Sequence, residues 1–226
     1  MAYILHQSAL KNMSKIIQRY YPLLPIFGMG IYLIVFTIAA FGYPGGSQNI
    51  PNAIGYSFFH NFLCDVMLPT APNGWQNPAV HLARISHFIL SGTMISFFYI
   101  LPEIFDWSNK NTKMVRYAGM LTMTVFIFMY TSFHDHIVTL TGVLGTVALI
   151  PFFMEMRKYP NDSLKYLAYL CFLLSIIVFF IFETKIGIYY LPFLQKITFF
   201  FDACWVIWVS HIVWRKKSTM NNLAFR

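Results

Sequence analysis

Long apolar runs separated by polar segments dominate the sequence. Six of these runs are about twenty residues long, which is enough for an α-helix to cross the roughly 30 Å hydrocarbon core of a bilayer. They cover residues 23–42, 82–105, 115–133, 137–154, 164–183 and 194–214. The connecting segments are short except for residues 43–81, which are rich in Gly, Pro and Asn. The pattern predicts an all-α, polytopic membrane protein with six transmembrane helices.

The composition favours one membrane domain over the whole chain. Hydrophobic residues make up 58% of the sequence and charged residues only 11%, whereas a soluble domain carries about 25% charged residues. We therefore predict a single transmembrane helical domain over residues 1–226, with membrane lipid as its partner and no soluble module. The net charge of +8 does not indicate nucleic-acid binding, because the basic residues lie at helix ends and form no patch among exposed aromatic residues. The sequence indicates no particular protein partner.

The basic residues predict how the helices are oriented. Thirteen of the sixteen Lys and Arg lie in the N-terminal segment, in the connectors after the second and fourth runs, and in the C-terminal tail. The positive-inside rule places these segments in the cytoplasm. Both termini are then cytoplasmic, which requires an even number of spans, so the shorter apolar stretch 53–68 is not counted as a seventh. We expect a multi-pass protein of the cell membrane, specifically the inner membrane of a bacterium.

Histidine and acidic residues gather on the opposite, outer side of the predicted bundle. Five of the seven histidines map there, together with several acids. Ionisable residues in or near membrane helices are costly to bury and often mark functional sites. The residues concerned are His60, His81, His87, His134, His136, Asp65, Asp135, Glu183 and Asp202.

The middle of the long loop predicts a short helix at the outer surface. If residues near 54–68 are helical, then Ser57, His60, Asn61, Cys64 and Asp65 share one face and apolar residues fill the rest. We expect an amphipathic outer helix whose apolar face lies in lipid or against the bundle. Ser57, His60 and Asp65 are then candidate catalytic residues. Alternatively, the polar residues of this segment only hydrate an exposed face.

Four residues at the outer helix ends are candidate metal ligands. His134 and His136 form a His-x-His pair, while His87 and Asp202 lie toward the outer ends of the second and sixth runs. Such a set could hold zinc with one open coordination position. Zinc lowers the pKa of a bound water to about 7, which suits hydrolysis of a lipid ester or amide. Alternatively, the two histidines cap helices and Asp202 pairs with a nearby basic side chain.

One stretch resembles part of a known group of proteins. Residues Gly55–Gly92, GYSFFHNFLCDVMLPTAPNGWQNPAVHLARISHFILSG, are similar to the first outer loop and second helix of bacterial six-span membrane proteins of unknown function. Those proteins carry a GYS…N..SD-like pattern and are distantly similar to the DRAM and Sfk-type proteins. In this chain Cys64-Asp65 stands where that pattern has Ser-Asp. The resemblance covers under a fifth of the chain and implies the six-span topology but little chemistry.

A fainter resemblance concerns the alkaline ceramidase and adiponectin-receptor superfamily of membrane zinc hydrolases. Those proteins use a Ser, a His and an Asp in early spans, to which Ser57, His60 and Asp65 are similar. They also carry HxxxH in the last span and have a seventh span, both of which this sequence lacks. What the resemblance implies is a zinc-dependent hydrolase.

Three functional hypotheses follow. The first is a metal-dependent hydrolase acting on lipid. The second is a non-catalytic membrane protein that binds lipid or a partner, or provides a solute pathway. The third is a haem protein with His87 and either His134 or His136 as axial ligands. The inner halves of the helices hold almost no ionisable residues, which argues against an ion-coupled transporter. Motifs of serine hydrolases, zincins and nucleotide-driven pumps do not occur.

Overall fold

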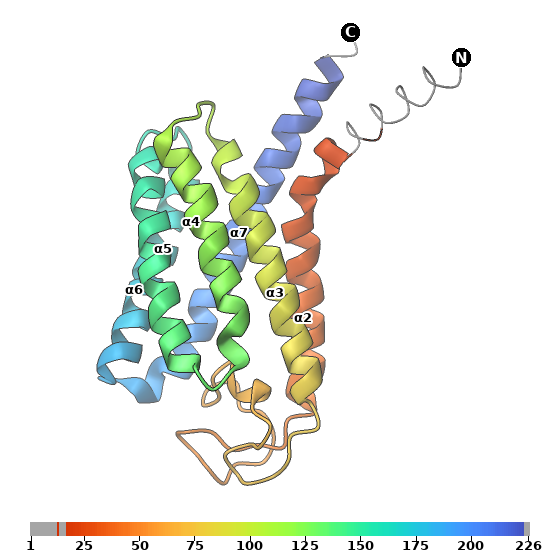
Figure 1. Ribbon diagram of the computed structural model, residues 1–226, viewed down its shortest axis with the longest axis vertical. Helices are drawn as coiled ribbons and strands as arrows, with labels where there is room; N and C mark the ends of the chain where they lie inside the picture. The colour runs from red at the N-terminus through yellow and green to blue at the C-terminus, as the bar shows by residue number, and fades with distance from the viewer. Residues whose placement is uncertain (1–12, 14–16, 224–226) are drawn as a thin grey trace.

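The computed structural model describes residue 13 and residues 17–223, and all regular secondary structure in this part of the chain is helical (Figure 1). The predicted all-α class is therefore confirmed for the described residues. The α-helices are α2 (Leu24–Phe41), α3 (Val80–Ile100), α4 (Lys110–Phe126), α5 (His134–Met156), α6 (Asp162–Thr184) and α7 (Leu191–Leu223). The 3-10 helices are η1 (Tyr21–Leu23), η2 (Asp65–Met67), η3 (Leu101–Ile104), η4 (Ile127–Tyr130) and η5 (Ile188–Tyr190).

Five helical segments are long and apolar enough to cross a membrane. They are Ile17–Phe41, Val80–Ile104, His134–Met156, Asp162–Thr184 and Ile188–Thr219. Their outward faces are apolar: Phe27 and Ile34 on α2, and Leu173 and Phe180 on α6, are each more than half exposed. An apolar surface of this extent suits lipid as its surroundings and is unfavourable in water. These helices fit a multi-pass membrane protein.

Helix α4 differs from the other five because its first two turns are basic. Lys110, Lys113 and Arg116 lie there, so the apolar part of α4 is shorter than in its neighbours. The predicted span 115–133 corresponds to α4 and η4, which ends at Tyr130. Figure 1 shows α4 side by side with α3 and α5, both of which it contacts along its length.

The helices run alternately up and down, so successive connectors lie at opposite ends of the bundle (Figure 1). Helices α2 to α5 are neighbours in chain order, and α7 packs against α2, α3 and α6. One end carries the loop 42–79 and the connectors 127–133 and 185–190, and we name it the loop end. The other carries the connectors 101–109 and 157–161 and the last turns of α7. We name it the basic end, because most of the described Lys and Arg gather there.

The core of the bundle forms around Trp205 of α7. Its ring lies 5.3 Å from that of Phe97 on α3 and 5.4 Å from that of Phe152 on α5, centroid to centroid, in edge-to-face geometry. Phe97 and Phe152 are both 1% exposed. Aromatic rings bury large areas and favour this arrangement, so α3, α5 and α7 are joined at mid-bundle by three rings.

The predicted amphipathic helix near 54–68 is wrong. This segment consists of turns, and η2 is its only helical piece. Side chains replace helical backbone bonds: the Ser57 amide donates to Asn61 Oδ1 at 2.8 Å, and the Phe62 amide donates to Asp65 Oδ2 at 2.9 Å. Gly55 has a φ of 71°, which an α-helix does not accommodate. The polar residues at helical spacing therefore hold turns together and do not form a hydrated helix face.

Candidate functional site

The loop 42–79 folds into a cap over the loop end of α2, α3 and α7 (Figure 1), which we name the loop cap. Its interior combines an apolar cluster around Val66 with buried polar residues, namely Ser47, Asn61, Asp65 and Asn77. The Asn77 side-chain amide donates to the carbonyl oxygens of residues 66 and 68 at 2.7 and 2.9 Å. Buried polar groups are costly unless they are hydrogen-bonded, and here they serve to fix a loop that has little regular backbone structure.

Asn61 is the central residue of the loop cap, with no exposed surface. Its Nδ2 donates to the Gly46 carbonyl at 2.7 Å and to Asp65 Oδ2 at 2.9 Å, while its Oδ1 accepts from the Ser57 amide. Burial raises the pKa of Asp65 above its ordinary value, although the bonds from Asn61 and Phe62 oppose this effect. The Asp65 carboxyl is thus buried in the loop cap and uses its hydrogen bonds to stabilise the turns there.

Lys196 of α7 joins the loop cap to the bundle. It is 7% exposed, and its Nζ donates to the Asn61 carbonyl and, at 2.9 Å, to the Pro192 carbonyl. It also lies 5.6 Å from the ring centroid of Tyr56 and 5.4 Å from that of Phe58. Carbonyl oxygens and aromatic faces both stabilise a buried cation. A residue of the last helix therefore holds a loop that is more than 100 positions earlier in the chain.

The three candidate catalytic residues do not form a catalytic arrangement. Asp65 accepts from Asn61 and Phe62 and makes no hydrogen bond to His60 among the described contacts. The Nδ1 atom of His60 is buried without a hydrogen-bond partner, and its ring lies 5.7 Å from that of Tyr189. Ser57 takes part through its backbone amide. A nucleophile and its base need to be within hydrogen-bond reach, which these side chains are not.

Cys64 is the other nucleophilic side chain of the loop cap. Burial raises the pKa of its thiol to about 12, and the nearby Asp65 carboxyl adds to this effect. The thiolate is the nucleophilic form of cysteine. Cys64 therefore stays protonated at neutral pH and is not an activated nucleophile.

The predicted metal ligands are also not brought together. His87 is buried and its Nε2 lies 2.9 Å from the Phe126 carbonyl, which links α3 to the end of α4. The Asp202 side chain lies against the Cys171 thiol between α7 and α6, and His136 is exposed. Among the described residues, no group of three or more His, Cys, Asp or Glu is placed to hold a metal ion. The structure therefore lends no support to the zinc site that His87, His134, His136 and Asp202 were expected to form.

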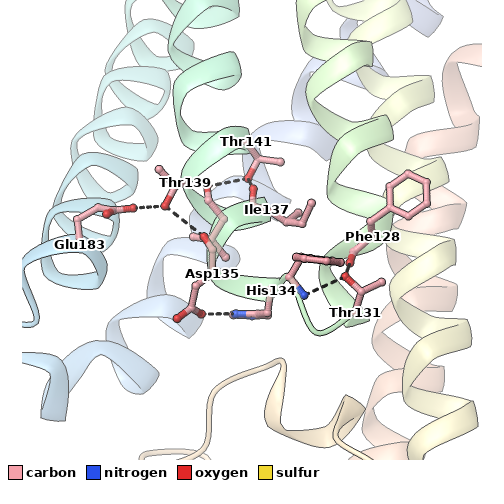
Figure 2. Close-up of polar contacts among 10 residues, drawn as sticks. Phe128, Thr131, His134, Asp135, Ile137, Thr139, Thr141 and Glu183 are labelled. Carbon is pink, nitrogen blue, oxygen red and sulfur yellow. Dashed lines mark hydrogen bonds and ion pairs between the residues drawn. The ribbon is translucent and has the colours of Figure 1, made fainter.

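The His-Asp-His segment instead organises the first turn of α5. Figure 2 shows His134 and Asp135 side by side, with His134 Nδ1 at 2.8 Å from Asp135 Oδ1. One turn further on, Thr139 Oγ1 donates to Glu183 Oε1 of α6 at 2.6 Å (Figure 2). Asp135 at a helix N-terminus also interacts favourably with the helix dipole. These contacts start α5 and tie it to α6 at the loop end.

The basic end has a buried polar cluster of its own, centred on Glu155 of α5. Glu155 is 0% exposed and accepts hydrogen bonds from Trp107 Nε1 at 2.7 Å, Asn109 Nδ2 at 2.9 Å and Asn111 Nδ2 at 2.6 Å. Lys158 Nζ donates to it from the following turn at 3.1 Å. A buried carboxylate with four donors is fully satisfied. It fixes the connector 101–109 against α5.

A cavity of about 430 Å³ lies beside this cluster at the basic end. It is lined by η3 with the connector after it, by the first two turns of α4 and by the last turns of α7. The aromatic residues Phe105, Trp107 and Tyr117 also line it. Four basic and two acidic side chains also line it, which gives a formal net charge of +2: Lys113, Arg116, Lys216, Lys217, Glu103 and Asp106.

The two acids only partly neutralise the four cations of the cavity. Lys217 Nζ lies 2.9 Å from Glu103 Oε2, and Lys216 Nζ lies 2.7 Å from Asp106 Oδ1. Arg116 reaches Glu103 more loosely, at 3.5 Å, and its Nε is buried without a hydrogen-bond partner. Lys113 is exposed and has no ion-pair partner within the described part of the chain. The cavity therefore has positive charge to offer an anion.

Sequence reasoning missed this cavity. From the sequence, Lys113, Arg116, Lys216 and Lys217 predict only the orientation of the helices. A signal was present in the sequence, since basic residues of two separate segments are predicted on the same side of the membrane. Nothing in the sequence indicates that α4 and α7 bring these residues to one cavity.

No protein-family model matches the chain, and comparisons with curated proteins and with solved structures find no match.

Proposed function

We propose that the protein is a six-span protein of the cell membrane that binds the phosphate headgroup of an anionic phospholipid in the basic cavity. The observation that carries the proposal is the net positive charge of a cavity lined by the ends of α4 and α7. Basic pockets between membrane helices on the cytoplasmic side suit phospholipid headgroups. This is the lipid-binding, non-catalytic alternative among the hypotheses raised by the sequence.

The orientation needed for this function rests on the distribution of charge. The positive-inside rule assigns the basic end to the cytoplasm, where anionic lipids make the leaflet surface negative. In this orientation α4 also crosses the membrane and brings the number of spans from five to six. It connects the end of α3 to the start of α5, which lie at opposite ends of the bundle, and both of these helices fit membrane-crossing helices. Its N-terminus then lies at the cytoplasmic interface, where the positive end of the helix dipole also favours an anion.

The chemistry of the cavity fits a phosphate better than a neutral ligand. Lys113 supplies donors that are not used within the described protein, and the Arg116 guanidinium is held only loosely by Glu103 at 3.5 Å. Charge-assisted hydrogen bonds to phosphate are about twice as strong as neutral ones. Trp107 and Tyr117 suit the boundary between headgroups and acyl chains, where aromatic residues are enriched. The expected metal ligands do not lie together among the described residues. The metal-dependent lipid hydrolase therefore stays a prediction.

Lipid binding to paired charge variants tests the proposal. The purified protein in micelles is titrated with dihexanoyl phosphatidylglycerol, dihexanoyl phosphatidylcholine or glycerol phosphate, and binding is followed by native mass spectrometry. We expect the anionic lipid to bind more tightly than the zwitterionic one. Binding of glycerol phosphate as tight as that of the lipid would identify a soluble phosphate compound as the ligand.

The variant K113Q/R116Q removes one Lys and one Arg from the cavity, and K110Q/R157Q removes the same two charge types from exposed positions at the same end. Only the first variant should lose affinity for phosphatidylglycerol, by about tenfold or more, since each charged hydrogen bond contributes about 1.5–3 kcal/mol. An equal loss in both variants, or none in the first, would show that the cavity does not bind the headgroup.

A further inference from the structure

A row of exposed aromatic side chains crosses from the loop cap to α7. It consists of Phe58 and Phe59 of the loop cap, Tyr189 and Tyr190 of η5, and Phe193 of α7, and we name it the aromatic ridge. The exposed fractions of these residues are 54%, 58%, 51%, 69% and 37% in that order. Rings this exposed on a loop outside a hydrophobic core are costly in water and indicate a surface that something covers.

The ridge brings together residues from distant parts of the chain, as a group of three Phe rings and a pair of Tyr rings. The ring centroid of Phe193 lies 5.2 Å from that of Phe59 and 6.3 Å from that of Phe58. Tyr189 and Tyr190 stack edge to face at 5.3 Å. The loop cap and η5 are also joined by Asn49, whose Nδ2 donates to the Tyr189 carbonyl at 2.8 Å.

The ridge extends the lipid-facing side of α7. Phe193, Phe200 and Ile207 follow one another at seven-residue intervals, so they share one face of the helix, and Phe200 and Ile207 are 61% and 40% exposed. Helix α7 belongs to a segment that is long and apolar enough to cross a membrane. Phe58 and Phe59 pack on the end of this apolar face and not over the centre of the bundle.

The length of α7 places the ridge at the edge of the bilayer. At about 1.5 Å per residue, Phe193 and Arg215 are separated by about 33 Å along the helix, close to the roughly 30 Å thickness of the hydrocarbon core. When Arg215 lies at the cytoplasmic boundary, Phe193 therefore lies at the opposite one. Aromatic residues are enriched at this level, because their rings favour the zone between acyl chains and headgroups.

The ridge cannot turn inward to hide its rings. Lys196 donates to the Asn61 carbonyl directly beside Phe58, and Gln195 Oε1 accepts from the Leu63 amide at 3.2 Å on the other side of the same turn. Asn61 and Lys196, which lie behind the ridge, are already buried and hydrogen-bonded. The exposure of Phe58 and Phe59 is therefore built into the folded loop cap.

We propose that the aromatic ridge is immersed in the outer leaflet, at the boundary between acyl chains and headgroups, so that the loop cap is attached to the membrane surface. The occupant is lipid because the ridge is continuous with a lipid-facing helix side and lies at its end. A soluble protein partner would have to bind at the edge of the bilayer, against a surface that lipid already covers. This inference is independent of the headgroup cavity, which lies at the other end of the bundle.

Photo-crosslinking tests the position of the ridge. The photoreactive aromatic residue p-benzoylphenylalanine replaces Phe59 in one variant, Phe58 in a second and the exposed Asn52 of the same loop in a control. Each protein is purified, reconstituted into vesicles of phosphatidylcholine and phosphatidylglycerol, illuminated and analysed by mass spectrometry. We expect phospholipid adducts at positions 58 and 59 to exceed those at position 52 at least fivefold.

Two results would overturn the proposal. One is an adduct yield at positions 58 and 59 no higher than at position 52, which would show the ridge to be in water. The other is crosslinking of position 59 mainly to a second copy of the chain, which would show a protein interface. Because Phe58 and Phe59 are more than half exposed, the label can be accommodated at either position, and each variant checks the other. The variant K113Q/R116Q should leave the crosslinking unchanged whatever its effect on lipid binding at the cavity.

Discussion

Replacing Asn61 with alanine tests whether this one side chain holds the loop cap closed. Asn61 is fully buried, and its side chain makes three hydrogen bonds: it accepts from the Ser57 amide and donates to the Gly46 carbonyl and to Asp65 Oδ2. In N61A all three are lost. Gly46 retains a bond from Tyr43 Oη at 3.1 Å, and Asp65 retains one backbone donor, so neither acceptor is left entirely without a partner.

The expected magnitude follows from the kinds of bonds lost. Two neutral hydrogen bonds contribute about 1 kcal/mol each, and the bond to the Asp65 carboxylate contributes about 1.5–3 kcal/mol. The free energy of opening the loop cap should therefore fall by about 3.5–5 kcal/mol. Since 1.4 kcal/mol corresponds to a factor of ten, the cap should open roughly 300 to 4,000 times more often.

Hydrogen–deuterium exchange measured by mass spectrometry gives this quantity region by region. Peptides covering residues 55–68 should exchange faster in N61A by the factor above, while peptides from α3 and α5 stay protected, because local opening does not require the bundle to unfold. Asn52 is exposed on the same loop, so N52A is the matched control and should exchange like the unmodified protein. Exchange in N61A within threefold of the control, or acceleration spread equally over the helices, would refute the argument.

Three further changes probe the remaining clusters. In E155Q an amide replaces the carboxylate that accepts from four donors, and its NH₂ group cannot accept a hydrogen bond. The free energy of unfolding in micelles should therefore fall by at least about 3 kcal/mol. The control D162N, at an exposed carboxyl, should change stability by under about 1 kcal/mol. Because burial raises the pKa of Asp65 in the folded cap, folding takes up a proton as the pH falls, and stability rises with it. The unmodified protein should therefore gain melting temperature relative to D65N as the pH falls from 7 toward the ordinary carboxyl pKa of about 4, and a constant difference would contradict this. E103Q removes a carboxylate that competes for the cavity cations, so native mass spectrometry should show phosphatidylglycerol binding roughly two- to fivefold tighter; weaker binding would count against the cavity.

The helices were predictable because each is encoded locally. The apolar runs 164–183 and 137–154 correspond to α6 (Asp162–Thr184) and α5 (His134–Met156) within a few residues. Asn161 caps α6 by accepting from the Leu164 amide, and Lys185 ends it with a positive φ of 61°. Run length and capping are properties of neighbouring residues, so they are visible without the fold.

The candidate site was predicted less well, because it depends on long-range contacts. Spacing placed Ser57, His60 and Asp65 on one face of a helix that does not form. Their actual partners are Asn61, a backbone amide and, through the cap, a lysine of the last helix. Helical periodicity cannot distinguish residues that share a helix face from residues that stabilise consecutive turns.

The sequence by itself determined that the chain is helical, where the apolar helices lie, and how the basic residues and most of the histidines are segregated along it. These features follow from hydropathy and charge, which act on segments of about twenty residues. Only the tertiary structure decided which polar residues meet. It buried Asn61 under Lys196, joined Glu155 to the connector 101–109, and left a basic cavity between α4 and α7. Each of these contacts joins residues far apart in the chain, and their partners are set by how the helices pack.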